Sequence, residues 1–420
     1  MTYNCLCCLI QSNVVRAISN GSKSYIYNLG IESPGTAIVN AYSGGTVRAV
    51  RPAAITTSYR INQTNGDALP GDMITNHTAS MNASASTDAI AAIRANSHLY
   101  VGRYDTTNNI LNVRQVSDSD KTLWASGGSI TFGEEDDLFM KLPRFKWKCE
   151  EVDTDIWELT FASSDAISGS GWNLWEGDTF IGVYKAYINN NKVYSKSRVT
   201  PTVNRSWTDF TACARARQNN NNYRLVTYEA HQIMCLLGYG WLGTTDAQGI
   251  VGAGTSSHSK TTGLTNSKGM SDSSAFVDGN STSINFWGLE NWWGDISEWV
   301  DNLKSSDAYG VNILGDDRTT VDRNVAPCAS SIGEIKKLKL GTNGDVLPAT
   351  CVTNGNYNKA FADVGYIMLG IGYVANRSSV GLLSEGGLAC LAVCYGASSI
   401  QNNNSSRLLY KGNYKVVDSL

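Results

Sequence analysis

Hydrophobic and polar residues alternate along much of the chain, in short runs bounded by clusters of Gly, Asn, Asp and Ser. A period of two residues is typical of β-strands. Between residues 98 and 188 the runs follow one another closely: HLYVGRY, ILNVRQV, SITF, LFMKLPRFKWKCEEV, DIWELTFAS and TFIGVYKAYI. The NNNKVYS segment that follows has the turn residues of a hairpin. We therefore expect β-sheet to dominate this stretch.

Two segments have the 3.6-residue period of a helix instead. Residues 86–96 are rich in Ala around Ile90 and Ile93, with a Ser or Thr available as N-cap. Residues 227–237 start at Thr227, a good N-cap, and place Glu229 at the positive end of the helix dipole. Apolar side chains recur at helical spacing behind it, so both segments are predicted to be helices.

These patterns divide the chain into three parts. Residues 1–55 contain the strand-like runs SYIYNLGI, TAIVNAY and TVRAVRP, and are predicted to form a small β module for attachment or oligomerisation. Residues 56–97 begin with a polar, turn-rich run and are predicted to be a linker with a short helix. Residues 98–420 are predicted to form the main domain.

The composition excludes two classes of partner. Charged residues make up 17% of the 420 residues and the net charge is -3, so the chain has no basic field for binding nucleic acid. No window approaches 18 consecutive apolar residues, so membrane insertion is not expected. The first residues lack the pattern of a secretion signal, which indicates synthesis in the cytosol.

The ten cysteines do not form the pattern of a disulfide framework. Three crowd the N-terminus, Cys390 and Cys394 form a close pair, and the others stand alone. A lone cysteine in an apolar run is usually a small buried hydrophobe. The four histidines are scattered, so a zinc site is not expected. His231, on the predicted helix, is interpreted as a surface or hydrogen-bonded residue.

The most distinctive run is INFWGLENWWGDISEWVDNL, residues 284–303. Most of its four tryptophans must be buried, because each carries roughly 150–250 Å² of largely apolar surface. The run also holds four carboxylates, for which we expect structural roles: Glu290, Asp295, Glu298 and Asp301. A loop calcium site is the alternative, because Ca²⁺ prefers carboxylate and carbonyl oxygens.

Three segments carry a resemblance to a known family. Residues 294–300, GDISEWV, resemble the G-N-V-W-E-W-V signature of the formylglycine-generating-enzyme superfamily. Residues 223–234, YRLVTYEAHQIM, look like its R-L-P-T-E-A-E-W helix, and residues 402–412, NNNSSRLLYKG, look like its closing N-x-G-F-R strand. The resemblance covers about 200–420. It implies an α+β chain with a C-type-lectin-like fold in the C-terminal half, preceded by the small β-rich module.

The block before residue 200 is similar to lectin-like ligand-binding proteins of phage tails and gut bacteria. Several of those proteins are diversified at adenines by retroelements, and the corresponding variable segment here would be 381–401. Asn codons mutated at adenine cannot encode Trp, Met, Lys, Gln or Glu, and residues 386–400 contain none of these. The resemblance thus implies ligand-binding residues in this segment, with two tryptophans at its rim: Leu388, Cys390, Ala392, Cys394, Tyr395, Gly396, Ile400, Trp292 and Trp293.

These features together predict a binding protein. We expect a receptor-binding protein of a phage tail or virion whose partner is a host cell-surface protein or glycan. A homo-oligomer is expected, and a trimer would multiply weak contacts by avidity. A bacterial surface adhesin of the same fold is the alternative.

An enzyme is the third reading, because the superfamily is named for a copper-dependent oxidase that uses a pair of cysteines near its C-terminus. Cys390 and Cys394 lie in the matching region. Three residues separate them, however, where the family has four, and their neighbours offer no general base. We therefore expect no enzymatic activity, no catalytic residues and no cofactor apart from the calcium alternative.

Overall fold

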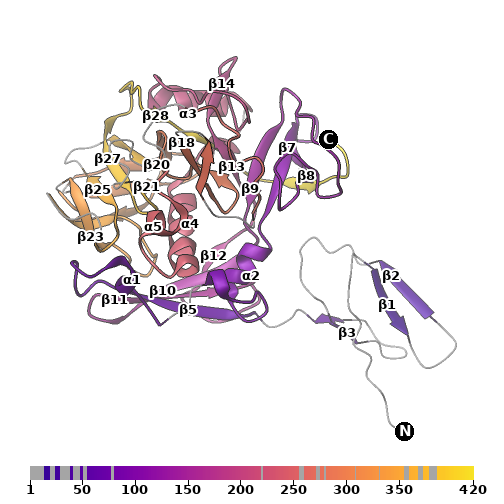
Figure 1. The fold of residues 1–420 in the computed structure, drawn as a ribbon, viewed down its shortest axis with the longest axis horizontal. Helices are drawn as coiled ribbons and strands as arrows, with labels where there is room; N and C mark the ends of the chain where they lie inside the picture. The colour runs from indigo at the N-terminus through magenta and orange to yellow at the C-terminus, as the bar shows by residue number, and fades with distance from the viewer. Residues whose placement is uncertain are drawn as a thin grey trace, which may run out of the picture.

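Figure 1 shows the computed structural model of the chain. It describes residues 54–420 except 77–79, 219–220, 255–259, 271–274, 279–280, 308, 331, 354–358, 368–371 and 378–385, together with the backbone of four strands nearer the N-terminus. Those strands pair as two antiparallel hairpins, β1 (Val14–Ile18) with β2 (Ser24–Asn28) and β3 (Ile38–Asn40) with β4 (Arg48–Val50). The attachment role predicted for residues 1–55 lies outside the described residues.

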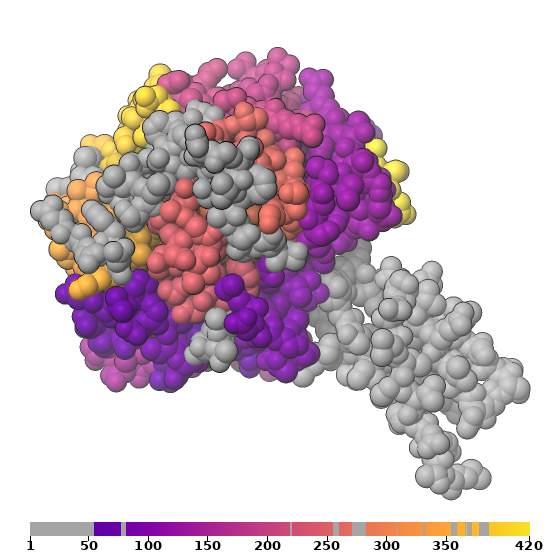
Figure 2. Space-filling view, in the orientation of Figure 1, coloured from indigo at the N-terminus to yellow at the C-terminus, as the bar shows by residue number. Residues whose placement is uncertain are grey.

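An antiparallel sheet of five described strands forms one side of the body, in the order β12-β10-β11-β5-β6. Its strands are β5 (Thr56–Asn62), β6 (Ile74–Thr75), β10 (Phe145–Asp153), β11 (Ile156–Ala162) and β12 (Asn173–Trp175). The short elements α1 (Pro70–Met73), η1 (Ser80–Asn82) and α2 (Ala89–Ala95) accompany it. In Figure 2 the indigo and purple residues of this part form a continuous side of the molecule.

The linker predicted over 56–97 is therefore wrong for most of that range. Strand β5 pairs along its full length with β11, and its inward Tyr59 and Ile61 are fully buried. The hydroxyl of Tyr59 donates a hydrogen bond to the carbonyl oxygen of Leu236, 2.5 Å away. The helix predicted at 86–96 is α2, but its N-cap is Asp88, which accepts a hydrogen bond from the backbone N–H of Ala91.

A second sheet contains seven described strands in the order β16-β29-β13-β9-β7-β8-β30. They are β7 (His98–Asp105), β8 (Ile110–Gln115), β9 (Asp137–Lys141), β13 (Thr179–Lys185), β16 (Tyr223–Leu225), β29 (Arg407–Lys411) and β30 (Tyr414–Val416). The predicted hairpin is present as β14 (Tyr187–Asn189) and β15 (Lys192–Tyr194). The SITF run, 129–132, makes only an isolated bridge at Ser129 and is not a strand.

The third sheet contains nine described strands, in the order β22-β21-β20-β26-β27-β25-β23-β24 with β28 beside β20. They are β20 (Ser297–Ser305), β21 (Val311–Leu314), β22 (Val321–Val325), β23 (Gly333–Leu338), β24 (Pro348–Val352), β25 (Val364–Ile367), β26 (Tyr373–Arg377), β27 (Leu391–Gly396) and β28 (Asn404–Ser405). A smaller sheet joins β17 (Ala275–Asp278), β18 (Ser281–Phe286) and β19 (Leu289–Glu290).

Helix α4 (Tyr228–Leu242) lies in the middle of the body (Figure 1). It starts at the predicted N-cap, where the Thr227 side chain accepts a hydrogen bond from the backbone N–H of Ala230. All of its residues except Glu229 are buried. Gly238 and Gly240 lie where an added Cβ would collide with Leu388 and with Ile90, respectively. The helix is therefore enclosed on several sides, which explains why it is apolar around its whole circumference.

Two further helices complete the described structure, α3 (Trp207–Arg215) and α5 (Ala247–Val251). None of the helices in the described part of the chain is long and apolar enough to cross a membrane. Four of the lone cysteines, Cys149, Cys213, Cys235 and Cys328, are free and buried, as predicted for small hydrophobic residues, and Cys351 is free and partly exposed.

Candidate functional site

The tryptophan-rich run lies in the core. It forms the end of β18, all of β19 and most of β20, and its four tryptophans are fully buried, as expected for most of them: Trp287, Trp292, Trp293 and Trp299. The rim position predicted for Trp292 and Trp293 is therefore wrong. Trp293 packs against Phe286 and donates a hydrogen bond from Nε1 to the carbonyl oxygen of Gly252, and Trp292 lies under the guanidinium of Arg377.

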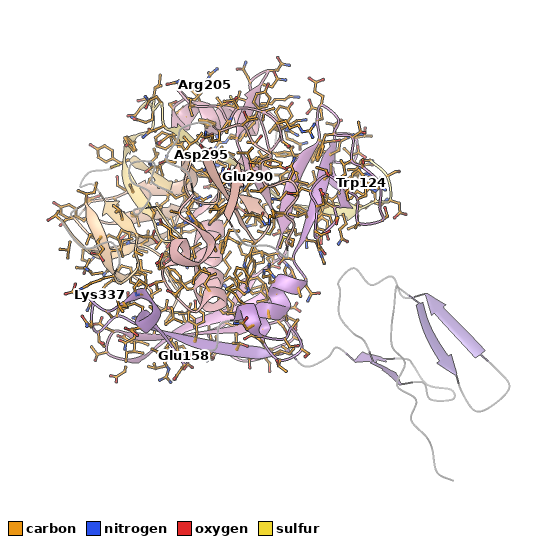
Figure 3. The ribbon with its side chains drawn as sticks, viewed as in Figure 1. Trp124, Glu158, Arg205, Glu290, Asp295 and Lys337 are labelled. Atoms are coloured by element: carbon orange, nitrogen blue, oxygen red, sulfur yellow. The ribbon has the colours of Figure 1, made fainter. Side chains whose placement is uncertain are left out.

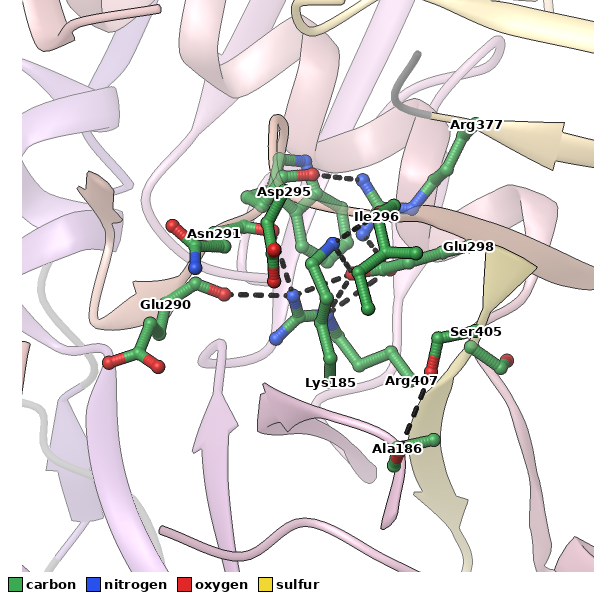
Figure 4. A network of polar contacts seen from close by, with 12 residues as sticks. Lys185, Ala186, Glu290, Asn291, Asp295, Ile296, Glu298, Arg377, Ser405 and Arg407 are labelled. Atoms are coloured by element: carbon green, nitrogen blue, oxygen red, sulfur yellow. Dashed lines mark hydrogen bonds and ion pairs between the residues drawn. The ribbon is translucent and has the colours of Figure 1, made fainter. Parts of the chain in front are cut away.

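Glu298, in the same run, is the centre of a buried ion network (Figure 4). Its Oε1 accepts hydrogen bonds from Nζ of Lys185 at 2.9 Å and from Nη2 of Arg407 at 2.7 Å. Its Oε2 accepts a hydrogen bond from Nη2 of Arg377. All four side chains are at most 2% exposed. Three cations thus surround one carboxylate, which we call the Glu298 hub.

The cations of the hub also donate hydrogen bonds to backbone carbonyl oxygens. Arg407 donates from Nη1 to the carbonyl oxygens of Gly182 and Val183, at 2.9 and 2.6 Å, and from Nη2 to those of Glu290 and Asn291, at 2.9 and 3.1 Å. Lys185 donates to the carbonyl oxygen of Ile296 at 2.7 Å. The hub therefore links two strands of the second sheet, β13 and the closing strand β29, to the tryptophan-rich run.

The charges of the hub shift the pKa values of its members. Burial alone would raise the pKa of Glu298, but the charges of Arg377, Arg407 and Lys185 outweigh it and hold the pKa well below its usual value. Burial lowers the pKa of Arg377 to about 10, with Glu298 acting in the opposite direction. The negative charge of Glu298 therefore offsets part of the desolvation cost of burying three cations.

The other carboxylates of the run have separate partners. Glu290 accepts hydrogen bonds from the backbone N–H groups of Gly263 and Thr265, at 2.8 and 2.7 Å. Asp295 accepts one from the backbone N–H of Lys260, and Asp301 pairs with Arg318 at 2.6 Å. Figure 3 places Glu290 and Asp295 inside the body. These contacts agree with structural roles, and the described residues contain no group of three or more His, Cys, Asp or Glu side chains arranged to hold a metal ion.

His231 lies on α4 and is fully buried beside the ring of Tyr228. Neither ring nitrogen has a hydrogen-bond partner among the described residues. Burial lowers the pKa of His231 to about 3, and the nearby charge of Arg377 acts in the same direction. The prediction of a surface or hydrogen-bonded histidine is therefore wrong, because the helix is buried on all sides.

The predicted ligand-binding segment divides into a buried part and an accessible part. Residues 386–390 turn inward, and β27 begins only at Leu391. Leu388 packs on α4 at Gly238, and the backbone N–H of Ala389 donates to Asp363 at 2.9 Å. Leu388 and Cys390 are 1% and 5% exposed, so their predicted surface position is wrong. Residues 381–385 lie outside the described residues.

Along β27 the side chains alternate as expected for a strand. Leu391 and Val393 are fully buried in the core of the third sheet, whereas Ala392 and Cys394 are partly exposed. Tyr395 and Gly396 are also partly exposed, and Ile400 is 64% exposed. We call the accessible residues the candidate surface: Ala392, Cys394, Tyr395, Gly396 and Ile400.

Residues distant in sequence contact the candidate surface and the segment that follows it. The ring of Tyr395 meets that of Trp299 edge-on, with centroids 5.6 Å apart. The backbone N–H of Thr208, at the start of α3, donates to the carbonyl oxygen of Ala397 at 3.1 Å, and that of Asn204 donates to Gln401 at 3.0 Å. The sequence analysis did not predict α3 or its contact with residues 397–401, although the S-W-T-D capping box at the start of the helix is a signal that could have indicated it.

The cysteine pair has an environment unlike that of a metal-binding pair. Cys390 is buried, and burial raises the pKa of Cys394 to about 11. A thiol with that pKa is protonated at neutral pH, whereas the thiolate is the form that binds copper and acts as a nucleophile. This environment does not favour the oxidase alternative.

A cleft of about 550 Å³ lies at the N-terminal end of α4, between β12 and the β21–β22 turn. Six of the residues that line it carry carboxylates, and two of these illustrate partners within the chain: Asp316 pairs with Arg224 at 2.5 Å, and Glu229 accepts hydrogen bonds from Asn302 at 3.0 Å. Its lining comes from segments between residues 174 and 411, which explains why no local sequence pattern predicted it.

Comparison with known proteins identified no relative of the chain. No protein-family model matches the chain, and no curated protein matches it.

Proposed function

We propose that the chain is a ligand-binding protein with a C-type-lectin-like scaffold of the formylglycine-generating-enzyme type, and that the candidate surface contacts its ligand. The partner is a protein or glycan on a host cell surface, and the binding protein is carried in oligomers on a phage tail or virion. A bacterial surface adhesin of the same fold is the alternative setting.

The Glu298 hub supports the proposed scaffold. Glu298 belongs to the segment that resembles the tryptophan signature of the superfamily, and Arg407 belongs to the segment that resembles its closing strand. The two side chains form a fully buried ion pair across 109 positions of sequence. Two segments that carry the resemblance, far apart in the sequence, thus meet at one point in the core, as parts of one scaffold should.

The alternation along β27 is the observation that carries the binding proposal. The buried side chains of Leu391 and Val393 hold the strand in the sheet, so the outward side chains of Ala392 and Cys394 can change with little effect on the core. Tyr395 and Ile400 are the largest side chains of the candidate surface. Binding energy is usually concentrated in a few such aromatic and apolar anchors at a protein interface.

The test compares the full-length chain with a Tyr395→Ser/Ile400→Ser variant for binding to a panel of intact bacterial cells. On a cell type that the parent chain binds, we expect the variant to bind at least about tenfold more weakly, because truncating an anchor costs about 1–2 kcal/mol or more. Circular dichroism establishes that both chains are folded. The readout is the fluorescence of labelled protein retained on cells.

Val416→Ser is the matched control. Val416 is 57% exposed, close to the value for Ile400, and lies on β30, at the opposite side of the body from β27 in Figure 1. It should leave binding unchanged. Equal binding by the parent chain and the double variant would contradict the proposed site.

A further inference from the structure

Lys121, which lies between β8 and β9, is a buried lysine whose amine contacts a side-chain amide. It is 1% exposed, and its backbone N–H donates a hydrogen bond to the carbonyl oxygen of Asn266 at 2.8 Å. Its Nζ donates to Oδ1 of Asn285 at 2.8 Å. The same Nζ donates to Oγ1 and to the carbonyl oxygen of Thr265, at 2.8 and 3.1 Å. An amine is thereby held against an amide carbonyl group in a site that is closed to bulk water.

The tight turn of the tryptophan-rich run places a carboxylate beside the same amide. Asn285 and Glu290 are directly opposite each other in the pairing of β18 with β19. The two residues of the turn, Trp287 and Gly288, have φ angles of 50° and 77°, and a type I′ turn requires positive φ at both. Opposite residues of such a pair lie on the same face of the hairpin. Glu290, which is 2% exposed, is therefore a neighbour of Asn285.

Thr265 connects the amine to this carboxylate. Its hydroxyl accepts a hydrogen bond from Nζ of Lys121 and donates one to Oε2 of Glu290, both at 2.8 Å. The amide of Asn285 is fixed on its other side, because Nδ2 donates to the carbonyl oxygen of Gly269 at 2.9 Å. Thr265 and Asn285 are fully buried. Amide, amine, hydroxyl and carboxylate thus form one continuous path of hydrogen bonds.

We propose that Lys121 and Asn285 join in an intramolecular isopeptide bond, which the chain forms by itself once it has folded. Nζ already contacts the oxygen that is bonded to Cγ of Asn285, and near-attack geometries hold reacting atoms about 3–3.5 Å apart. A buried site disfavours charged groups. Glu290 therefore takes a proton from the ammonium group through Thr265, which leaves a neutral, nucleophilic amine.

The reaction is a transamidation. The lone pair of Nζ attacks Cγ of Asn285, the bond between Nζ and Cγ forms, and the bond between Cγ and Nδ2 breaks. Nδ2 leaves with the bonding electron pair and takes up the two protons that Nζ loses, so it departs as an ammonium ion. Glu290 is a carboxylate before and after the reaction, a state that its hydrogen bonds from the backbone N–H groups of Gly263 and Thr265 favour. No oxidant or reductant takes part.

The bond joins the segment between β8 and β9 to the tryptophan-rich run, across 164 positions of sequence. The described cysteines are free, so no disulfide among the described residues links these segments. A covalent link that closes a long loop restricts the unfolded chain, as a disulfide does. The isopeptide bond therefore raises the resistance of the fold to urea.

The test is mass spectrometry of the full-length chain, intact and after digestion with trypsin. We expect the intact mass to lie below the sequence mass by one ammonia molecule, and the digest to contain a branched peptide that joins Lys121 to Asn285. Trypsin does not cleave after an acylated lysine, so the peptide bond after Lys121 should stay intact. Lys185 is the internal control, because it is 2% exposed but contacts Glu298 and a backbone carbonyl oxygen instead of a side-chain amide.

Matched variants test the proposed path of the proton. Thr265→Val keeps the shape of the side chain but removes the hydroxyl, and Glu290→Gln keeps the shape but cannot take the proton. We expect both to form the link at least about a hundredfold more slowly than the parent, which is the lower end of the usual contribution of general acid–base catalysis. Thr265→Ser retains the hydroxyl and should form the link as the parent does. Circular dichroism establishes that each variant is folded.

A parent chain of unmodified mass, with separate peptides for Lys121 and Asn285 in its digest, would overturn the proposal. Loss of ammonia without the branched peptide would also overturn it, because cyclisation of Asn285 onto its own backbone gives the same change in mass. Equal rates of linking in Thr265→Val and Thr265→Ser would show that the hydroxyl does not carry the proton.

Discussion

Replacing Glu298 with glutamine is expected to lower the free energy of unfolding by about 3–5 kcal/mol, because it leaves buried charges without their counter-ion. Glutamine has nearly the same shape, so packing is preserved and only the charge is lost. Its amide NH₂ group would also face donors from Lys185, Arg377 and Arg407. Urea unfolding at pH 7, followed by tryptophan fluorescence, measures the change.

Glu158→Gln is the matched control. Glu158 pairs with Arg60 at 3.0 Å on the solvent side of the first sheet, where the two side chains are 26% and 37% exposed. Exposed pairs contribute at most about 1 kcal/mol, so this variant should stay close to the parent. If Glu298→Gln does not accumulate, adding Arg377→Met should recover part of the loss, because one buried cation is then removed. Equal effects of Glu298→Gln and Glu158→Gln would show that the hub does not hold the scaffold.

Replacing His231 with leucine is expected to remove a large part of the acid sensitivity of the fold. The pKa of His231 is about 3 in the folded chain, against about 6.5 when unfolded, so between these pH values the unfolded chain binds the extra proton. Folding stability therefore falls as the pH drops below 6.5, by about 1 kcal/mol per pH unit from this residue. Leucine cannot bind a proton, so the variant does not lose folding stability through this residue as the pH falls.

The measurement is urea unfolding of the parent and the His231→Leu variant at pH 7.0, 5.5 and 4.5. Between the first and last pH the variant should gain about 2–3 kcal/mol relative to the parent, and the other titrating groups cancel in this difference. At pH 7 the two should lie within about 1 kcal/mol, since two unpaired nitrogens are removed together with the ring contact to Tyr228. The partly exposed His98, changed to glutamine, is the control. If the free energies of unfolding of the parent and of His231→Leu change by the same amount with pH, the result would contradict the conclusion that His231 is buried and uncharged in the folded chain.

Local patterns in the sequence predicted local structure well. Thr227 and Glu229 indicated the start of α4, and alternation indicated most strands between 98 and 188. The predicted helix ended at residue 237, whereas α4 continues to Leu242 through Gly238 and Gly240, two residues of low helix propensity. Both glycines are there for close packing with residues distant in sequence, which no local pattern shows.

Long-range packing accounts for the larger differences. Strand β5 has only Tyr59 and Ile61 as inward residues in a polar run, so it resembled a linker, and its partner β11 lies about 100 residues later. At the candidate site the alternation of β27 was predictable, but the inward turn of residues 386–390 was not, because it depends on contacts of Leu388 with α4 and of Ala389 with Asp363. Arg377 had no motif to mark it as a member of the Glu298 hub.

Deep sequencing of the 3′ end of the gene, in the population from which it comes, tests the proposed diversified surface most directly. We expect adenine-directed substitutions at the codons of the candidate surface, Ala392, Cys394, Tyr395, Gly396 and Ile400. The codons of Leu391, Val393 and Arg407, whose side chains are fully buried, should stay constant. An invariant segment, or substitutions spread equally over buried and outward positions, would contradict a diversified binding surface on a fixed scaffold.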